Sequence, residues 1–205
     1  WDAHEKRLGT DPARAEGFHP VLDDGPEPER RREQAGYDAT KDFTAVEFCH
    51  VAEDRCLWRA TFAAPPRLDD TVFHLYVDAD ADSQTGRRAS PGSVVTGTDY
   101  MLTVSGGRGS SGYYAPGGER TGGPRVTHAV QGRTLYVSAD VDLGRDPEGI
   151  RFALYVLCHT TTQPGRPAAM SDSSRKVLVS GIAPSPGKKI LRPGDPEENY
   201  QVAAT

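Results

Sequence analysis

Three aspartates at alternate positions, Asp78, Asp80 and Asp82, are the residues whose types and spacing most clearly suggest chemistry. They directly follow an apolar segment and precede Gly86, so they share one short loop. Carboxylates so close together repel one another unless a cation or a cationic side chain compensates their charge. Calcium is a hard ion that takes about 6–8 oxygen ligands from carboxylates, carbonyls and water. The spacing therefore predicts a calcium site, which Asp99 at the start of the following strand completes.

The loop does not have the form of an EF-hand. A strand-like segment rather than a helix precedes it, and the downstream bidentate glutamate is missing. The alternative interpretation is a solvated acidic turn whose charge is balanced by Arg87 or Arg88. From the residues alone, neutralisation by a metal and neutralisation by an arginine both stay open.

Two of the three cysteines are placed to form a disulfide. Cys49 and Cys56 are equidistant from a turn centred between Ala52 and Glu53, so a regular hairpin puts them opposite each other. Cβ atoms of cross-strand neighbours lie about 4.5–5.5 Å apart, close to what a disulfide requires. We therefore expect a Cys49–Cys56 bridge, with Cys158 free, and an oxidising compartment. Two small buried thiols are the alternative.

Other motifs that carry chemistry are missing from the sequence. There is no CxxC or HExxH pattern for zinc, no Gly-x-Ser-x-Gly nucleophile and no phosphate-binding loop. His74 has no second histidine or cysteine at ligand spacing, so we interpret it as a half-exposed strand residue. Glycoside hydrolysis needs two carboxylates about 5–9.5 Å apart across a cleft, whereas aspartates in one turn converge. We therefore predict that the domain is not an enzyme, with a glycoside-active domain as the alternative.

Segments of alternating apolar and polar residues recur along the chain and must position these side chains. In 43–62 and in 124–142 two such segments flank a short turn, which predicts β-hairpins. Trp58 alternates onto the expected core face, as do Leu75 in the strand before the acidic loop and Leu102 in the strand after it. The pattern predicts an all-β fold, a single antiparallel β-sandwich of jelly-roll type.

Composition agrees with many short strands and argues against several partners. Gly (22) and Pro (16) are abundant, and the net charge of −5 with interspersed basic residues argues against nucleic-acid binding. No apolar run approaches the roughly 18 residues of a membrane span. We expect three parts: a polar, extended N-terminal arm (1–41), the sandwich (42–182) and an extended or disordered tail (183–205).

A resemblance to known domains rests on three segments, KDFTAVEFCHVAEDRCLWRATF, FHLYVDADADSQTG and GTDYMLTV. They resemble the sandwich domains related to family 9 carbohydrate-binding modules and the wider DOMON-like group. Those domains show an Asp-led first strand, an Asp-x-Asp…Thr-Gly turn and a Gly-Ala-Asp-Tyr strand. The resemblance covers residues 38–104 in motif and 125–182 in strand rhythm. It implies a jelly-roll-like sandwich, often appended to secreted enzymes, with structural calcium and in some members sugar binding.

The function that these features predict is a non-catalytic, calcium-stabilised binding or accessory module with carbohydrate as the candidate ligand. Aromatic side chains stack on sugar rings, and the candidates are Trp1, Tyr76, Tyr113 and Tyr114, the last two presented by a glycine-rich loop. We expect the module to belong to a larger protein that is secreted, periplasmic or on the cell surface. The alternative is a structural or protein-interaction domain without a glycan ligand.

Overall fold

The computed structural model describes residues 18–25, 37–52, 54–90, 92–160 and 172–183. These residues contain thirteen strands and no helix, and so no helix that is long and apolar enough to span a membrane. Most of both predicted arms, and Trp1 with them, lies outside the described residues. The all-β prediction is confirmed.

The first sheet has five strands in the order β1-β2-β3-β9-β8, all paired antiparallel. The alternating segments of the two predicted hairpins form four of these strands, because each has one apolar face to bury. The bounds are β1 His19–Asp23, β2 Phe43–Ala52, β3 Arg55–Phe62, β9 Thr134–Asp140 and β8 Thr127–Gln131.

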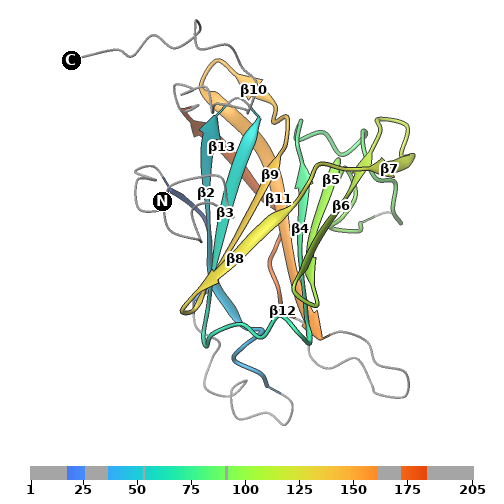
Figure 1. Ribbon diagram of the computed structural model, residues 1–205. Helices are drawn as coiled ribbons and strands as arrows, with labels where there is room; N and C mark the ends of the chain where they lie inside the picture. Colours follow the sequence, from blue (N-terminus) through green and yellow to red (C-terminus); the bar gives the residue numbers. More distant parts are fainter. Residues whose placement is uncertain (1–17, 26–36, 53, 91, 161–171, 184–205) are drawn as a thin grey trace, which may run out of the picture.

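The second sheet has the order β10-β11-β4-β5-β6-β7, and two further strands, β12 and β13, pair with β11. Its long central strand β11 is the most continuously apolar segment of the chain. The bounds are β10 Arg145–Asp146, β11 Gly149–Thr160, β4 Thr71–Asp78, β5 Tyr100–Ser105, β6 Arg108–Tyr114, β7 Arg120–Gly122, β12 Asp172–Ser173 and β13 Val177–Ile182. Figure 1 shows β4, β5 and β6 side by side, with β11 next to β4.

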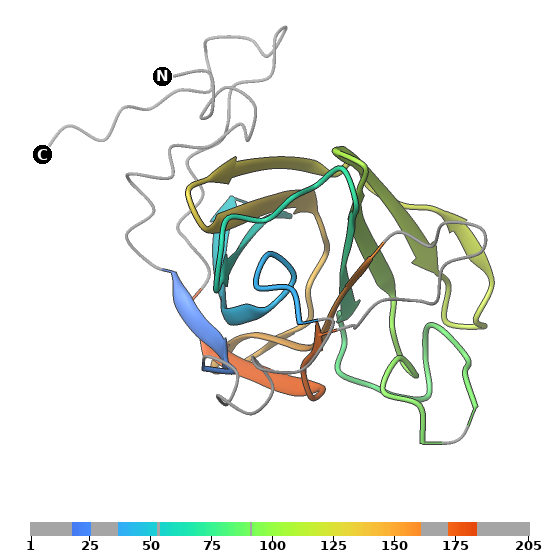
Figure 2. The ribbon, with the colours of Figure 1, turned by 90° about the horizontal axis from the view of Figure 1, so that it is seen from below.

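The core lies between the two sheets, which Figure 2 shows from below. Phe48 of β2 meets Phe152 of β11 with ring centroids 4.9 Å apart, so aromatic rings join the layers directly. Trp58, Leu75 and Leu102 are all buried in this core, on the faces that alternation predicts. Burial of side chains of this size stabilises the fold by about 1.5–3 kcal/mol each.

Part of the predicted N-terminal arm is a strand of the first sheet. β1 pairs with β2, with His19 opposite Phe48 and Asp23 opposite Ala45. Its partly buried Val21 and Leu22 pack against the core. This strand was not predicted in the sequence analysis, because the segment has only two or three apolar residues and its surroundings are polar.

The predicted disulfide is wrong, because the hairpin register differs from the symmetric one by one residue. Cys49 pairs with Leu57 and His50 pairs with Cys56, with a bulge between His50 and Ala52. A shift of one residue turns a side chain to the other face of a sheet. Cys56 therefore lies in the core between the sheets, whereas Cys49 belongs to a small cluster on the outer face. All three cysteines are free and buried, so the argument for an oxidising compartment falls away.

The glycine-rich segment after β5 is not a loop that presents tyrosines. It forms β6 and β7, and Tyr113 and Tyr114 lie at the end of β6. Its glycines allow close packing, since a Cβ on Gly109 would lie 2.5 Å from the carbonyl oxygen of Val126. Gly109 therefore fits a crowded strand, whereas Gly106 and Gly107 lie in the turn before β6 with positive φ.

Candidate functional site

Three of the four predicted metal ligands converge at one end of the second sheet. β4 ends at Asp78, and Asp99 directly precedes β5, so the antiparallel pairing of these strands brings the two carboxylates together. The backbone N–H of Asp99 donates to the carbonyl of Val77 and closes this end of the ladder. One carboxylate oxygen each from Asp78, Asp80 and Asp99 lies within 4.8 Å of the others. Asp78 and Asp99 are buried and Asp80 is exposed, so the cluster opens to solvent on one side.

Asp82 is not brought into this cluster. Its side chain is exposed, and its carboxylate accepts a bond of 2.9 Å from the backbone N–H of Gln84. Its own N–H donates to Asp78 Oδ1 (3.1 Å) and to Asp80 Oδ1 (2.9 Å). Asp82 thus contributes a backbone donor to the loop, because the turn after Ala81, with φ of 54°, directs its side chain away.

Two glycines leave the space in which the carboxylates meet. Gly86 has φ of +63°, and a Cβ there would lie 2.7 Å from Asp99 Oδ1. Gly97 has φ of +83°, and a Cβ there would lie 2.8 Å from Asp78 Oδ2. Both positions combine a left-handed backbone with close approach, which glycine alone accommodates. The loop pattern indicated Gly86, and Gly97 begins the GTDY segment on which the resemblance rests. The pairing of β4 with β5 brings Gly97 close to the loop.

A lysine from the other end of the chain partly compensates the cluster. Lys176 Nζ lies 2.6 Å from Asp78 Oδ2 and 2.7 Å from the carbonyl oxygen of Thr96. Burial raises the pKa of Asp78 even though Lys176 lowers it. Burial, together with the charges of Asp80 and Asp78, raises the pKa of Asp99 to about 6. The carboxylates of Asp78, Asp80 and Asp99 together carry more negative charge than Lys176, their described cationic partner, neutralises.

Arg87, which the sequence offered as a counter-ion of the loop, instead contacts aromatic rings. Its guanidinium lies 5.9 Å from the ring centroid of Tyr76 and 5.7 Å from that of Tyr114. Both tyrosines are 8 % exposed, so their rings pack within the protein. Tyr113 is half-buried, and its ring lies 5.1 Å from that of Tyr100. Of the described aromatic candidates, Tyr113 is the one that keeps a partly accessible ring.

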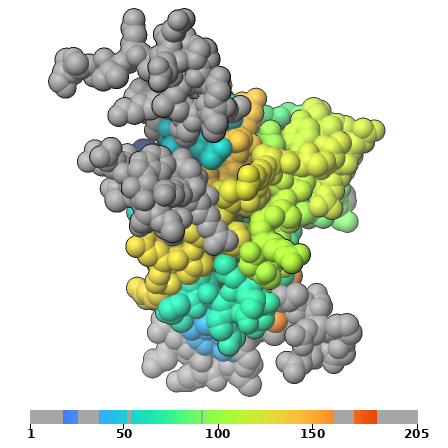
Figure 3. All heavy atoms as spheres, viewed as in Figure 1, coloured from blue at the N-terminus to red at the C-terminus, as the bar shows by residue number. Residues whose placement is uncertain are grey.

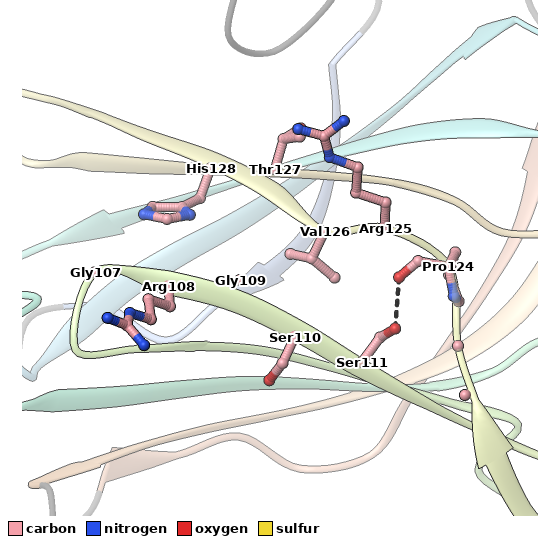
Figure 4. Close-up of a pocket in the computed structure, with 12 residues that line it drawn as sticks. Gly107, Arg108, Gly109, Ser110, Ser111, Pro124, Arg125, Val126, Thr127 and His128 are labelled. Carbon is pink, nitrogen blue, oxygen red and sulfur yellow. Dashed lines mark hydrogen bonds between the residues drawn. The ribbon is translucent and has the colours of Figure 1, made fainter.

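A groove of about 750 Å³ lies between β6 and the segment that leads into β8, and nothing in the sequence analysis predicted it. Figure 3 shows the yellow β8 region beside the yellow-green β6–β7 region on the viewed face. β6 contributes Arg108, Ser110 and Ser111 to its walls, and the facing segment contributes Arg125 and His128. Figure 4 shows these residues on the two facing segments. Among the described residues that line the groove there is no tyrosine or tryptophan.

A hydrogen bond from a side chain to the backbone joins the two walls. The hydroxyl of Ser111 donates to the carbonyl of Pro124 over 2.5 Å, as the dashed line in Figure 4 marks. Val126 is buried between the walls, whereas Arg108 and Arg125 are exposed. β8 is the last strand of the first sheet, so its outer edge has no strand partner in the described part of the chain. The groove therefore presents the polar donors of Arg108, Ser110 and Arg125 from two segments that a hydrogen bond joins.

No protein-family model, curated protein or solved structure matches this chain.

Proposed function

We propose that the domain is a non-catalytic binding module that calcium stabilises through Asp78, Asp80 and Asp99. The observation that carries this proposal is the convergence of three carboxylates within 4.8 Å, two of them buried. Calcium accepts such carboxylate oxygens together with backbone carbonyls and water. Water and carbonyl oxygens of the loop complete the shell on the exposed side of Asp80. The ion also offsets the burial and the repulsion by Asp80 and Asp78 that otherwise raise the pKa of Asp99.

A binding role fits this cluster better than a catalytic one. Glycoside hydrolysis places its two carboxylates about 5–9.5 Å apart with the substrate between them. One carboxylate oxygen each from Asp78, Asp80 and Asp99 lies within 4.8 Å of the others, which leaves no room for a substrate between them. They support an ion rather than a reaction.

Carbohydrate is the ligand class that we assign to the groove between β6 and β8. Sugar hydroxyls need fixed polar partners, and Ser110, Arg108 and Arg125 line the groove on two braced segments. The two exposed arginines favour sugars that carry carboxylate or sulfate groups, because guanidinium binds such anions in bidentate fashion. A secreted or cell-surface location of the parent protein is consistent with such a ligand and belongs to this proposal.

A structural or protein-interaction domain without a glycan ligand is the second candidate. The ion pair of Lys176 with Asp78 favours it, since a lysine already supplies part of the missing charge. The burial of Tyr76 and Tyr114 favours it too, because neither ring is free to stack on a sugar.

A glycan array probed with and without calcium separates the two candidates. The binding-module proposal predicts retention of acidic glycans, weakened by chelator. The double variant Arg108→Ala/Arg125→Ala should weaken that binding about tenfold or more, as expected when guanidinium contacts to anions are removed. Arg133→Ala is the matched control, because Arg133 is exposed on the β8–β9 turn outside the groove. No glycan binding under either condition supports the structural alternative, and equal binding by the double variant moves the ligand site elsewhere.

A further inference from the structure

Two histidines from distant parts of the sequence meet on the outer face of the second sheet. The β4–β11 register pairs Leu157 with His74 and Val72 with His159, so the histidines are diagonal neighbours on adjacent strands. Phe73 and Cys158, the alternating neighbours of the two histidines, lie in the core, and both imidazoles therefore face outward. Each histidine is half-buried on a strand that is hydrogen-bonded on both sides.

The ring atoms have the geometry of a chelating pair. His74 Nε2 lies 3.3 Å from His159 Nε2. Two imidazole nitrogens that each lie about 2.0–2.1 Å from a tetrahedral zinc ion are separated by about 3.3–3.4 Å. The opposite ring nitrogens are both held: His159 Nδ1 lies 2.9 Å from the carbonyl oxygen of Thr160, and His74 Nδ1 lies 2.9 Å from Thr103 Oγ1. Such outer partners orient histidines that bind metals.

The hydrogen bonds also permit the required tautomers. A carbonyl only accepts, so His159 Nδ1 carries the proton and its Nε2 presents a lone pair. Without a metal, His74 donates its Nε2–H to that lone pair and accepts from the hydroxyl of Thr103. With a metal, His74 carries its proton on Nδ1, and the Thr103 hydroxyl rotates to accept it. The change of tautomer therefore requires the Thr103 hydroxyl to turn from donor to acceptor.

We propose that His74 and His159 bind one divalent transition-metal ion through their Nε2 atoms, with water in the remaining positions. Neutral imidazole suits zinc, copper and nickel rather than calcium. Among the described residues, no third carboxylate, thiol or imidazole group forms a cluster with this pair. The two rings therefore supply the protein ligands. This site is separate from the carboxylate cluster and does not depend on the proposed function.

The surroundings keep both rings available for a metal. His74 packs against the ring of Tyr76, with centroids 5.5 Å apart, and Tyr76 packs in turn against Tyr155. Burial, His159 and the charge of Arg87 lower the pKa of His74 to about 4.

Calorimetric titration with zinc tests the pair directly, using the full chain with calcium in excess so that the carboxylate cluster is occupied. Wild type should bind one zinc ion, and His74→Ala and His159→Ala should each weaken that binding about tenfold or more. His19→Ala is the matched control and should bind like wild type, because His19 lies on β1 in the other sheet. Equal zinc affinity in the His74→Ala/His159→Ala double variant overturns the proposal.

Nitrogen-15 spectra of the wild-type histidines give a second test that needs no variant. Zinc should shift the Nε2 signals of His74 and His159 together and leave both rings protonated at Nδ1. Rings that keep their metal-free tautomers at saturating zinc contradict the proposal, and the pair is then a hydrogen-bonded pair only.

Discussion

The acidic cluster and the histidine pair each take one residue from β4, Asp78 and His74, but they are assembled in different ways. Asp78 and Asp80 are neighbours in one loop, and Asp99 joins them through the next strand along the chain. His74 and His159 are 85 residues apart and meet only because β11 pairs with β4 in one particular register. The first group offers anionic oxygens for a hard ion, and the second offers neutral nitrogens for a softer one.

The contrast shows which chemistry can be found from spacing. A ligand set within one loop is visible in the sequence, because the turn that gathers it is local. A set divided between strands depends on register, and a shift of one residue turns a side chain to the other face. The same dependence hid His159 as a partner of His74 and suggested a Cys49–Cys56 disulfide that does not exist.

The largest effect should come from a substitution that fills the acidic cluster. Gly97→Ala places a Cβ 2.7 Å from the Ser83 Cα and 2.8 Å from Asp78 Oδ2 at a left-handed φ. We expect a loss of about 2–4 kcal/mol in the free energy of unfolding. Gly92→Ala is the control, because its φ is also positive but a Cβ there would have no atom within 4 Å. Similar losses for both variants in urea unfolding would show that backbone strain alone matters there.

A smaller effect should follow removal of the lysine that faces the cluster. The Lys176 side chain is 25 % exposed and that of Asp78 is 3 % exposed, so Lys176→Met leaves a nearly buried carboxylate without its cation. In chelator we expect a loss of about 1–3 kcal/mol, between the values for exposed and buried pairs. Calcium should stabilise this variant more than wild type, because the ion no longer competes with the lysine. Arg175→Met, on an exposed neighbour, should change neither quantity.

Calcium should abolish a dependence of stability on pH that comes from Asp99. Asp99 has a pKa of about 6 in the folded protein against 3.8 as its ordinary value, so the folded state holds the proton longer. In chelator, stability should therefore fall as pH rises from about 4 to about 6, relative to Asp99→Asn. With saturating calcium that fall should disappear over the same window, since the ion displaces the proton and leaves Asp99 ionised in both states. Thermal melts of both proteins across this range provide the measurement, and an identical slope in chelator and calcium contradicts it.

The fold was predictable because alternation is a local signal. Trp58, Leu75 and Leu102 lie in the core as their spacing indicates, and both long hairpins form. The β-bulge after His50, the short strand β1 and the groove beside β6 were not predictable, because each depends on contacts between distant segments. In the acidic loop, the ligand types could be predicted from the sequence, but the direction of the Asp82 side chain could not.

The most direct test of calcium binding is the melting temperature in chelator and in excess calcium for wild type, Asp80→Asn and Asp82→Asn. Asp80 belongs to the carboxylate cluster and Asp82 does not, so calcium should stabilise wild type and Asp82→Asn, by about 2.7 kcal/mol at a hundredfold excess over Kd. Asp80→Asn should lose most of that response, whereas the His74→Ala/His159→Ala variant should keep it. A wild-type melting temperature that is indifferent to chelator and to calcium would show that the loop is a solvated acidic turn paired with Lys176.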